Sequence, residues 1–173
     1  VCIRLIPALR DRKMELKIVD MKIPEGANLV LGQSHFIKTA EDIYEVMAGG
    51  VPGAKFAVAF SEASGDCLVR TEGNDKALIQ AARDSSLALA CGHTFVLLMK
   101  GAFPINILNS LKAVPEVCNI FCATANPLQV VIAETELGRG IMGVIDGFSP
   151  KGAESATDVA ERRKLLRRFG YKL

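Results

Sequence analysis

The chain has 173 residues, of which 50% are hydrophobic and 23% are charged, and its formal net charge is +2. This composition excludes a disordered chain, because so much apolar surface offsets the entropy lost on ordering. The small net charge argues against a nucleic-acid-binding protein. A mean hydropathy of +0.26 without a membrane segment indicates apolar surface buried between copies of the chain, so we expect a homo-oligomer.

Residues 1–13 carry four basic side chains and one acidic side chain and are expected to form an N-terminal extension. Residues 14–173 are expected to form a single domain. A secretory signal would need a longer apolar run and a small-residue cleavage site. The most apolar stretch, residues 87–99, is too short to span a bilayer. We therefore expect a cytoplasmic protein with no membrane partner.

Alternating or apolar runs predict eight strands, and helical periodicity between start and stop signals predicts four helices. The strands are expected at residues 16–21, 28–32, 55–60, 67–70, 93–99, 117–123, 128–134 and 139–145. The helices are expected at residues 39–50, 75–91, 104–113 and 157–170. Several neighbouring strands have connections short enough only for hairpins. The predicted fold class is therefore α/β of the α+β type, a mixed β-sheet with helices packed on it in one layered domain.

Three of the helix starts carry local signals. Thr39 is expected to cap the first helix, with Asp42 reaching back to it as in a capping box. Pro104 is expected at the first position of the third helix. Thr157-Asp158 is expected to cap the last helix.

The five cysteines include no CxxC pair and no spacing typical of a zinc or iron–sulfur site. Cys118 and Cys122 are expected on one face of a strand about 13 Å apart, too far for a disulfide. Most of the cysteines are expected to be small buried hydrophobic side chains.

The polar segment from Gly32 to Thr39 is the first candidate site, because it joins the end of a strand to the start of a helix. Ligands of open α/β sheets gather at the carboxyl ends of strands. A helix N-terminus offers free N–H groups and a positive dipole to an anion, and Lys38 adds a full charge. His35 in this setting is suited to act as a general base or as a nucleophile that carries a phosphoryl group. The alternative is a loop histidine that only bonds to its neighbours.

Cys91-Gly92-His93 is the second candidate, since a thiol and an imidazole together suggest a cysteine nucleophile. A helix-to-strand junction separates the two side chains and the flanks are apolar, which favours a buried and inert thiol. His93 is better explained as a second wall of a pocket. A thiol-dependent hydrolase acting through Cys91 is kept as a further function class.

The segment from Ser61 to Asp66 follows another strand and carries two hydroxyls and two carboxylates. Ser61 and Ser64 are suited to bind ribose hydroxyls, and Glu62 or Asp66 to hold Mg²⁺. A hairpin turn accounts equally well for Ser64-Gly65-Asp66, but it does not account for Glu62.

Two further polar positions follow strands later in the chain. Asn126 lies in a tight connection, where its amide is suited either to read a base edge or to cap a turn. Asp146 follows an apolar strand, where a carboxylate is suited to act as a Mg²⁺ ligand or a catalytic base. The alternative for Asp146-Gly147 is an ordinary turn.

The last predicted helix is amphipathic and basic. Its cations complement the dipole at the helix C-terminus, so a solvated face explains them better than a nucleic-acid patch. Leu165, Leu166 and Phe169 are expected to face the core or another subunit.

Six segments in this order resemble the adenosine-specific kinase family. They are GQSHFIKT (32–39), FSEASG (60–65), ACGH (90–93), ATANP (123–127), GVIDG (143–147) and LLRRFGYKL (165–173). The family is a small single-domain group of archaea and thermophilic bacteria that is unrelated to the sugar-kinase type of adenosine kinase. The resemblance runs from about Met14 to Leu173.

The resemblance implies a homo-oligomer, for example a trimer, that binds adenosine or AMP-type molecules and transfers a phosphoryl group. It implies ATP or another phosphoryl donor, with Mg²⁺. The catalytic residues are then expected to be His35, Lys38 and Asp146. The expected substrate contacts are Gln33, Ser34, Thr39, Ser61, Glu62, Ser64, His93 and Asn126. We favour a phosphohistidine at His35, since the loop lacks the glycines that usually cradle phosphate for direct transfer. The alternative function is a non-catalytic adenosine or AMP sensor.

Overall fold

Residues 13–173 are described by the computed structural model, so the expected N-terminal extension lies outside the described residues except for Lys13. Within this range the chain forms eight strands and four helices. The strands are β1 (Glu15–Asp20), β2 (Asn28–Ser34), β3 (Lys55–Ser61), β4 (Val69–Gly73), β5 (Thr94–Lys100), β6 (Val117–Thr124), β7 (Leu128–Thr135) and β8 (Gly138–Asp146). The helices are α1 (Thr39–Gly50), α2 (Lys76–Leu89), α3 (Pro104–Lys112) and α4 (Ala156–Arg168). Every element expected from the sequence is present, with its ends moved by a few residues.

The strands form two sheets rather than one, while the α/β class and the single domain of packed layers agree with the prediction. The larger sheet has the order β4-β3-β5-β2-β6, and the smaller has the order β1-β7-β8. All the strand pairs within these sheets are antiparallel. The sheet is therefore not mixed in strand direction, because each connection either forms a hairpin or returns the chain in the opposite sense.

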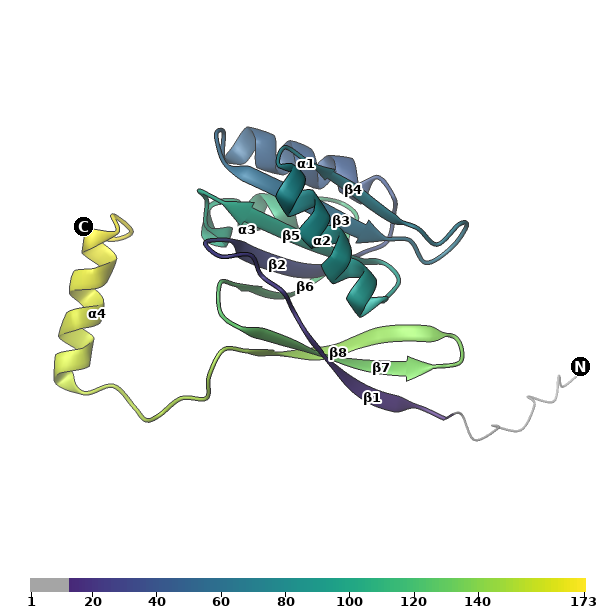
Figure 1. The fold of residues 1–173 in the computed structure, drawn as a ribbon. Coiled ribbons are helices and arrows are strands. Elements are labelled where there is room, and N and C mark those ends of the chain that lie inside the picture. Colours follow the sequence, from purple (N-terminus) through teal and green to yellow (C-terminus); the bar gives the residue numbers. More distant parts are fainter. Residues whose placement is uncertain (1–12) are drawn as a thin grey trace, which may run out of the picture.

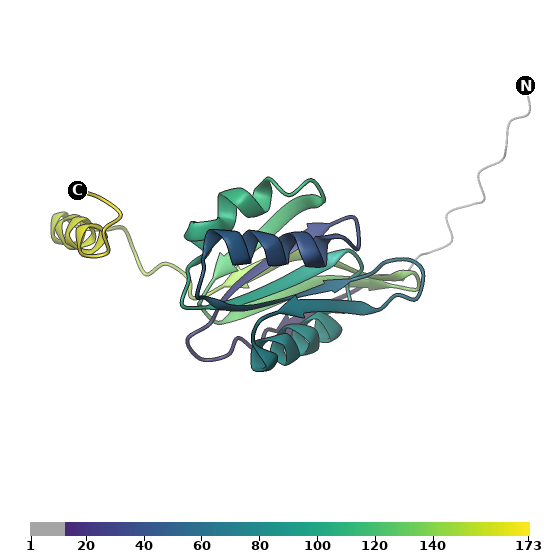
Figure 2. The ribbon, with the colours of Figure 1, turned by 90° about the horizontal axis from the view of Figure 1, so that it is seen from above.

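β5 is the central strand of the larger sheet, and its run TFVLLMK is buried on both faces. One face packs against α1 and α3, which lie behind the sheet in Figure 1. The other face packs against α2 and the smaller sheet. Seen from above, α1 and α3 lie together and α2 lies on the opposite side (Figure 2). The alternation of side chains along β5 thus fills two separate hydrophobic cores.

The start of α1 differs from the expected capping box. Lys38 precedes the helix with helical backbone angles and no side chain caps it. The Thr39 hydroxyl donates instead to the carbonyl of Phe36 at 2.5 Å, and Asp42 pairs with the Lys38 ammonium. The prediction was wrong here because a turn before the helix supplies the carbonyls that its first amides need.

The cap of α4 is also shifted. Ser155 is the N-cap, its hydroxyl accepts from the amide of Asp158, and the Asp158 carboxylate accepts from the amide of Ser155. Thr157 therefore lies inside the helix and does not cap it. The expectation for α3 is confirmed, since Pro104 is its first residue.

The cysteines within residues 13–173 are all free, which agrees with the expectation that Cys118 and Cys122 form no disulfide. Cys91 is buried and Cys122 is partly buried, whereas Cys67 and Cys118 are exposed. The expectation of buried thiols is therefore wrong for Cys67 and Cys118, which lie in a hairpin loop and on a partly open strand.

α4 stands away from the rest of the molecule. Figures 1 and 2 both show it at the end of an extended segment that leaves β8. No residue of α4 is buried, and no other helix or strand among the described residues packs against it. None of the described helices is long and apolar enough to cross a membrane. The cytoplasmic location stays a prediction.

Candidate functional site

Antiparallel pairing brings the ends of β2 and β3 to the same edge of the larger sheet as the starts of β5 and β6. Ser34 lies opposite Val117 at the start of β6, and Gln33 lies opposite Thr94 at the start of β5. Polar side chains from four segments therefore gather at one edge. This region, called here the His35 edge, comprises His35–Lys38, Ser61–Glu62, His93 and Glu116.

His93 ties the two strand ends together through its backbone. Its N–H donates to the carbonyl of Ser61 at 2.8 Å, and its carbonyl accepts from the N–H of Ser34 at 2.9 Å. The residue has a φ of 57°, in the left-handed region that few residues other than glycine adopt. Its imidazole stacks on Phe60, with ring centroids 6.0 Å apart. The second histidine thus lies at the same edge as His35, as the pocket-wall interpretation requires.

His35 follows directly after β2 and is exposed. Its N–H donates to the carbonyl of Glu116 at 3.1 Å, which fixes the backbone at this point. Its ring stacks beside Phe36, with centroids 6.2 Å apart. An imidazole that is held by its backbone but open to solvent is accessible to a ligand.

The amides after His35 provide the strongest anion-binding feature of this edge. The N–H groups of Thr39 and Ala40 donate to the carbonyls of Phe36 and Ile37. The N–H groups of Phe36, Ile37 and Lys38 have no acceptor among the described residues. Three successive free amides next to a helix start are typical of sites for phosphate and other anions.

Lys38 lies between two carboxylates. Asp42 pairs with its ammonium one helical turn away, and Oε1 of Glu116 lies 2.8 Å from its Nζ. Hydrogen bonds to Asp42, and to a smaller extent to Glu116, hold the pKa of Lys38 well above its usual range, so the ammonium stays charged. Glu116 itself is buried, and its Oε2 has no hydrogen-bond partner among the described residues. A buried carboxylate of this kind needs the nearby cation.

The predicted contacts on β2 and α1 have different environments. Gln33 is exposed, whereas Ser34 and Thr39 are buried. The Ser34 hydroxyl has no hydrogen-bond partner within residues 13–173. The Thr39 hydroxyl is already bonded to the Phe36 carbonyl. Gln33 is therefore the most accessible of the three to a ligand.

The predicted contacts on the β3–β4 loop are mostly engaged in holding that loop. The buried Ser61 hydroxyl is 2.7 Å from the hydroxyl of Ser86 on α2. Glu62 accepts from the N–H of Leu68 and from Arg70, and these bonds hold the pKa of its carboxyl below the usual range. Ser64 is exposed within the turn. The hairpin therefore explains Glu62, which turn chemistry alone had left unexplained.

Asn126 and Asp146 lie together but far from His35. Oδ1 of Asp146 accepts from the Thr124 hydroxyl at 2.6 Å and from the Asn126 amide at 3.1 Å. Thr124 lies opposite Leu29 at the start of β2, whereas His35 follows the end of that strand. Leu29 and His35 are six residues apart, which is a distance of about 20 Å along an extended strand. Within one chain, Asp146 and Asn126 do not adjoin the His35 edge.

Cys91 has the properties of a structural cysteine. It is fully buried, and burial raises the pKa of its thiol to about 11. Its Sγ donates weakly to the carbonyl of Leu89. A thiol that stays protonated near neutral pH is a poor nucleophile, which argues against the thiol-dependent hydrolase.

The chain matches the family model described as "Adenosine specific kinase" over residues 19–172. It belongs to that family. The match covers both the His35 edge and the Asp146 cluster. No curated protein matches the chain. A similar solved structure is that of the PH1918 protein from Pyrococcus horikoshii OT3, with 41% sequence identity and a TM-score of 0.89. That match covers 93% of this chain and 99% of the other.

In this member of the adenosine specific kinase family, sequence reasoning missed Glu116 as part of the site. Glu116 precedes β6 between Pro115 and Val117 and has no motif around it. The available signal was a lone carboxylate at the start of an apolar strand. Only the antiparallel pairing of β2 with β6 brings it to Lys38.

The described part of this family member contains no cluster of three or more His, Cys, Asp or Glu side chains that would hold a metal ion. At the His35 edge, Glu62 is engaged by Arg70, and both Asp42 and Glu116 face Lys38. These residues do not fit a dedicated Mg²⁺ site, because Glu62 and Asp42 already bind cations or amides and Glu116 has only Oε2 without a partner within residues 13–173. Mg²⁺ arriving with a nucleotide is commonly held mainly by the phosphates.

Proposed function

We propose that this chain is a phosphotransferase that binds adenosine or an adenine nucleotide and carries the phosphoryl group on His35. The observation that supports it best is the arrangement after β2. An exposed imidazole is followed by three amides without acceptors and by an ammonium that stays charged. Membership of the adenosine specific kinase family supports adenosine as the acceptor class.

The reaction takes place in two displacements. A ring nitrogen of His35 attacks the terminal phosphorus of ATP or another donor, so that an N–P bond forms and the bond to the donor oxygen breaks. The acceptor hydroxyl then attacks the same phosphorus, an O–P bond forms, and the N–P bond breaks. The hydroxyl proton passes to the released imidazole. Adenosine as acceptor gives AMP.

The residues around His35 have separate tasks in this proposal. The amides of residues 36–38 and the Lys38 ammonium bind the phosphoryl oxygens, since phosphoryl transfer depends chiefly on positioning and charge neutralisation. Glu116 is a positioning residue that holds Lys38. His93 forms a second wall, and Gln33 is the nearest accessible polar side chain on β2.

Asp146 and Asn126 require another copy of the chain if they are to act at the same site. They lie about 20 Å from His35 along β2, so within one chain no small ligand contacts both this pair and His35. The predicted homo-oligomer is therefore part of the proposal. The uncovered α4 supports it, because an amphipathic helix without a packing partner is incomplete in a single chain.

The first experiment is an intact-mass spectrum of the purified protein at neutral and at acidic pH, before and after incubation with ATP and Mg²⁺. Phosphoimidazole is labile to acid, whereas phosphoserine and phosphothreonine are not. We expect an acid-sensitive gain of one phosphate in the wild type and in His93→Asn, and no gain in His35→Asn. Loss of the phosphate only in His93→Asn would move the carrier to that ring.

Turnover and binding separate the enzyme from the alternative sensor. AMP formation from adenosine is measured for the wild type and for His35→Asn, and adenosine binding is measured by calorimetry. The proposal expects turnover only in the wild type, with binding in both. Binding without turnover or phosphate in either form would refute the carrier and favour the sensor.

A further inference from the structure

Two surfaces of the molecule are apolar and uncovered. The first is the outer face of the β1–β7–β8 sheet, which lies below the other layers in Figure 1 with no helix beneath it. Leu16, Ile18, Met142 and Ile145 are exposed on this sheet, the first three by 60% or more. Antiparallel sheets normally turn polar side chains to solvent on their outer face. An apolar outer face of this kind indicates an interaction surface.

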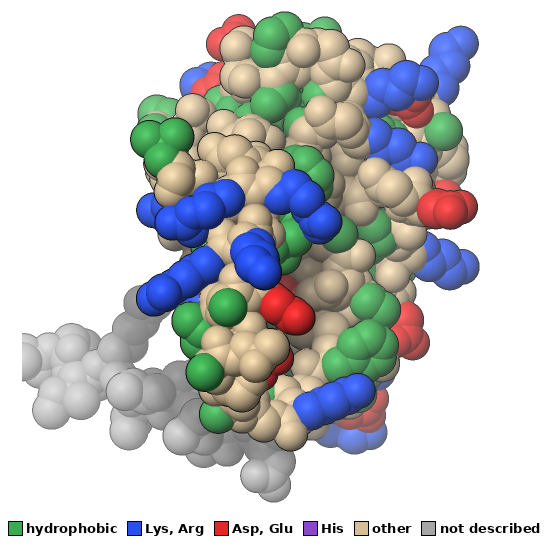
Figure 3. All heavy atoms as spheres, turned by 90° about the vertical axis from the view of Figure 1, so that its left-hand side faces the viewer, with side chains coloured by type: hydrophobic (Ala, Val, Ile, Leu, Met, Phe, Trp, Pro, Cys, Tyr) green, Lys and Arg blue, Asp and Glu red, His purple; other side chains and the backbone are tan. Residues whose placement is uncertain are grey.

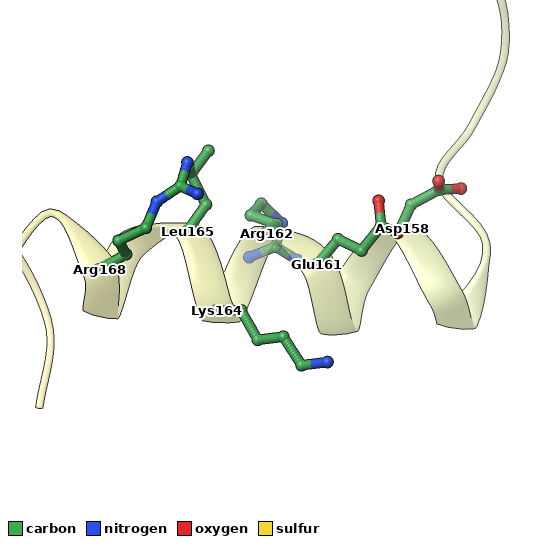
Figure 4. Close-up of a pocket in the computed structure, with 6 residues that line it drawn as sticks. All are labelled: Asp158, Glu161, Arg162, Lys164, Leu165 and Arg168. Atoms are coloured by element: carbon green, nitrogen blue, oxygen red, sulfur yellow. The ribbon is translucent and has the colours of Figure 1, made fainter.

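The second surface is α4. Leu165, Phe169 and Tyr171 are exposed on this helix and on the segment after it. In Figure 4 Leu165 and Arg168 project to one side of the helix, and Lys164 projects to the other. The hollow drawn there, lined by Asp158, Glu161 and four later residues, is formed by α4 alone. A helix of 13 residues without tertiary contacts is marginal in water.

Local interactions nonetheless stabilise the helical conformation of α4. Ser155 and Asp158 cap its start, and Arg162 makes two bonds to Glu154 at 2.8 and 3.0 Å. At its end Gly170 has a φ of 75°, and the N–H of Tyr171 donates to the carbonyl of Leu166, which closes the last turn. These local interactions define the helix but bury none of its side chains. The surface that packs against α4 therefore lies outside the described residues of its own chain.

The C-terminal residues 147–173 and the rest of the described chain have opposite net charges. Residues 147–173 carry seven basic and three acidic side chains, a net charge of +4. Residues 13–146 carry eleven basic and fifteen acidic side chains, a net charge of −4. Figure 3 shows Lys and Arg side chains gathered on the face where α4 lies. We call residues 147–173 the arm and residues 13–146 the body. Opposite net charges favour association of the arm with the body of another copy over association with a second basic arm.

The connecting segment has the length and stiffness of an arm. Residues 147–155 link β8 to α4, and nine extended residues span about 30 Å. Ser149 precedes Pro150, which disfavours a helical backbone at Ser149 and keeps the segment extended. The segment therefore directs α4 away from its own sheet, as Figures 1 and 2 show.

We propose that α4 is an exchanged arm that packs its Leu165 and Phe169 side onto the outer face of the β1–β7–β8 sheet of a second copy of this chain. The proposal rests on the homo-oligomer proposed above and is independent of the phosphoryl chemistry. Exchange of an element between identical chains is a common route to closed oligomers. It covers both apolar surfaces at once and pairs the basic arm with the acidic body.

The test measures the solution mass of full-length protein by light scattering after gel filtration. We expect the wild type at a multiple of 18.6 kDa. Leu165→Asp places a charge on the apolar side of α4, and Ile18→Lys places a charge on the outer face of the sheet. Each variant should have the mass of one chain. The control Ala160→Asp places the same charge on another position of α4. The control Leu137→Lys changes a residue that is 99% exposed at the β7–β8 turn, away from the face. Both controls should keep the wild-type mass.

Mixing the two variants distinguishes exchange from packing within one chain. Leu165→Asp retains the wild-type outer face of the sheet, and Ile18→Lys retains the wild-type α4. Their mixture should therefore regain a species of two chains. Failure of the mixture to associate would overturn the exchange. A wild type with the mass of one chain would also overturn it, as would an unchanged mass of Leu165→Asp.

Hydrogen exchange of the wild type gives a readout that needs no variant. The amides of α4 should be protected at least about 10-fold more at high than at low protein concentration, because dissociation returns the helix to solvent. Protection that is absent, or that does not change on dilution, would overturn the proposal. Protection that appears only with anionic lipid vesicles or with nucleic acid would assign the arm to those partners instead. None of these outcomes depends on whether His35 is phosphorylated.

Discussion

Replacing Gly32 by alanine is expected to destabilise the protein by about 3 kcal/mol, at the upper end of the usual cost of overpacking a core. Gly32 lies in β2 opposite Phe95 on β5. An added Cβ would lie 2.5 Å from Cε1 of Phe95 and 2.8 Å from the carbonyl oxygen of Asn119 on β6. Ordinary contacts need about 3.5 Å. Phe95 is fully buried and the carbonyl belongs to a paired strand, so neither can move without disturbing the sheet.

The assay is thermal unfolding followed by circular dichroism at one fixed protein concentration, because association makes Tm depend on concentration. For a chain of this length 1 kcal/mol corresponds to about 2–4 °C, so Tm should fall by about 6–12 °C. The matched control is Gly49→Ala. No atom lies within 4 Å of a Cβ at Gly49, which is inside α1. That change should leave Tm unchanged or raise it slightly.

A Gly32→Ala variant that melts within about 2 °C of the wild type would refute the argument from close approach. The double variant Gly32→Ala/Phe95→Leu provides a second check. Removing ring atoms should relieve part of the clash, so the two changes should cost less together than the sum of their separate costs.

Three further predictions concern single side chains. Asp75→Ala should lower Tm by a few degrees near pH 7, because Asp75 caps α2 by accepting from two backbone amides. These bonds and Lys55 hold the pKa of Asp75 below its usual value, so the difference in Tm should be lost as the pH falls below about 4. Cys91 should resist iodoacetamide at pH 8, where a pKa of about 11 leaves about 0.1% thiolate, and exposed Cys67 should react in the native protein. Glu116→Gln should lower the rate of His35 phosphorylation about 10-fold or more by releasing Lys38, measured by intact mass against time.

Each of these three has an outcome that contradicts it. The Asp75 argument fails if Asp75→Ala keeps the same Tm deficit at pH 3 as at pH 7. Alkylation of Cys91 as fast as Cys67 would show that the thiol is not buried in solution. Glu41→Gln, an exposed change on α1, is the control for Glu116→Gln, and equal rates in both would remove the positioning role.

The local elements could be predicted from the sequence because their signals are local. The apolar run of β5, the turn at Ser64-Gly65-Asp66 and Pro104 at the start of α3 each specify one conformation. The division into two sheets was not predictable in this way. The short connection from β6 to β7 resembles a hairpin, but these two strands belong to different sheets. Hydrogen bonds from Thr124 and Asn126 to Asp146 hold this connection.

The candidate site could be predicted only in part. His35, Lys38 and His93 were found from their residue types, and antiparallel pairing of β2 with β5 brings their segments to one edge. Glu116 was missed because its role depends on the register between β2 and β6. The capping box at Thr39 was wrong because the same Thr-x-x-Asp pattern fits two bonding schemes, and the preceding turn selects the other one.

The backbone of His93 has a consequence for how this position can change. The bonds to Ser61 and Ser34 use only its N–H and carbonyl, and its left-handed φ suits glycine best and asparagine next. His93→Gly should therefore relieve strain and keep both strand ends tied, while deleting the imidazole from the edge. A β-branched residue such as valine would force the junction to rearrange. The ring and the strand junction at residue 93 are thus independently variable, so a sequence can gain or lose the imidazole without changing the scaffold.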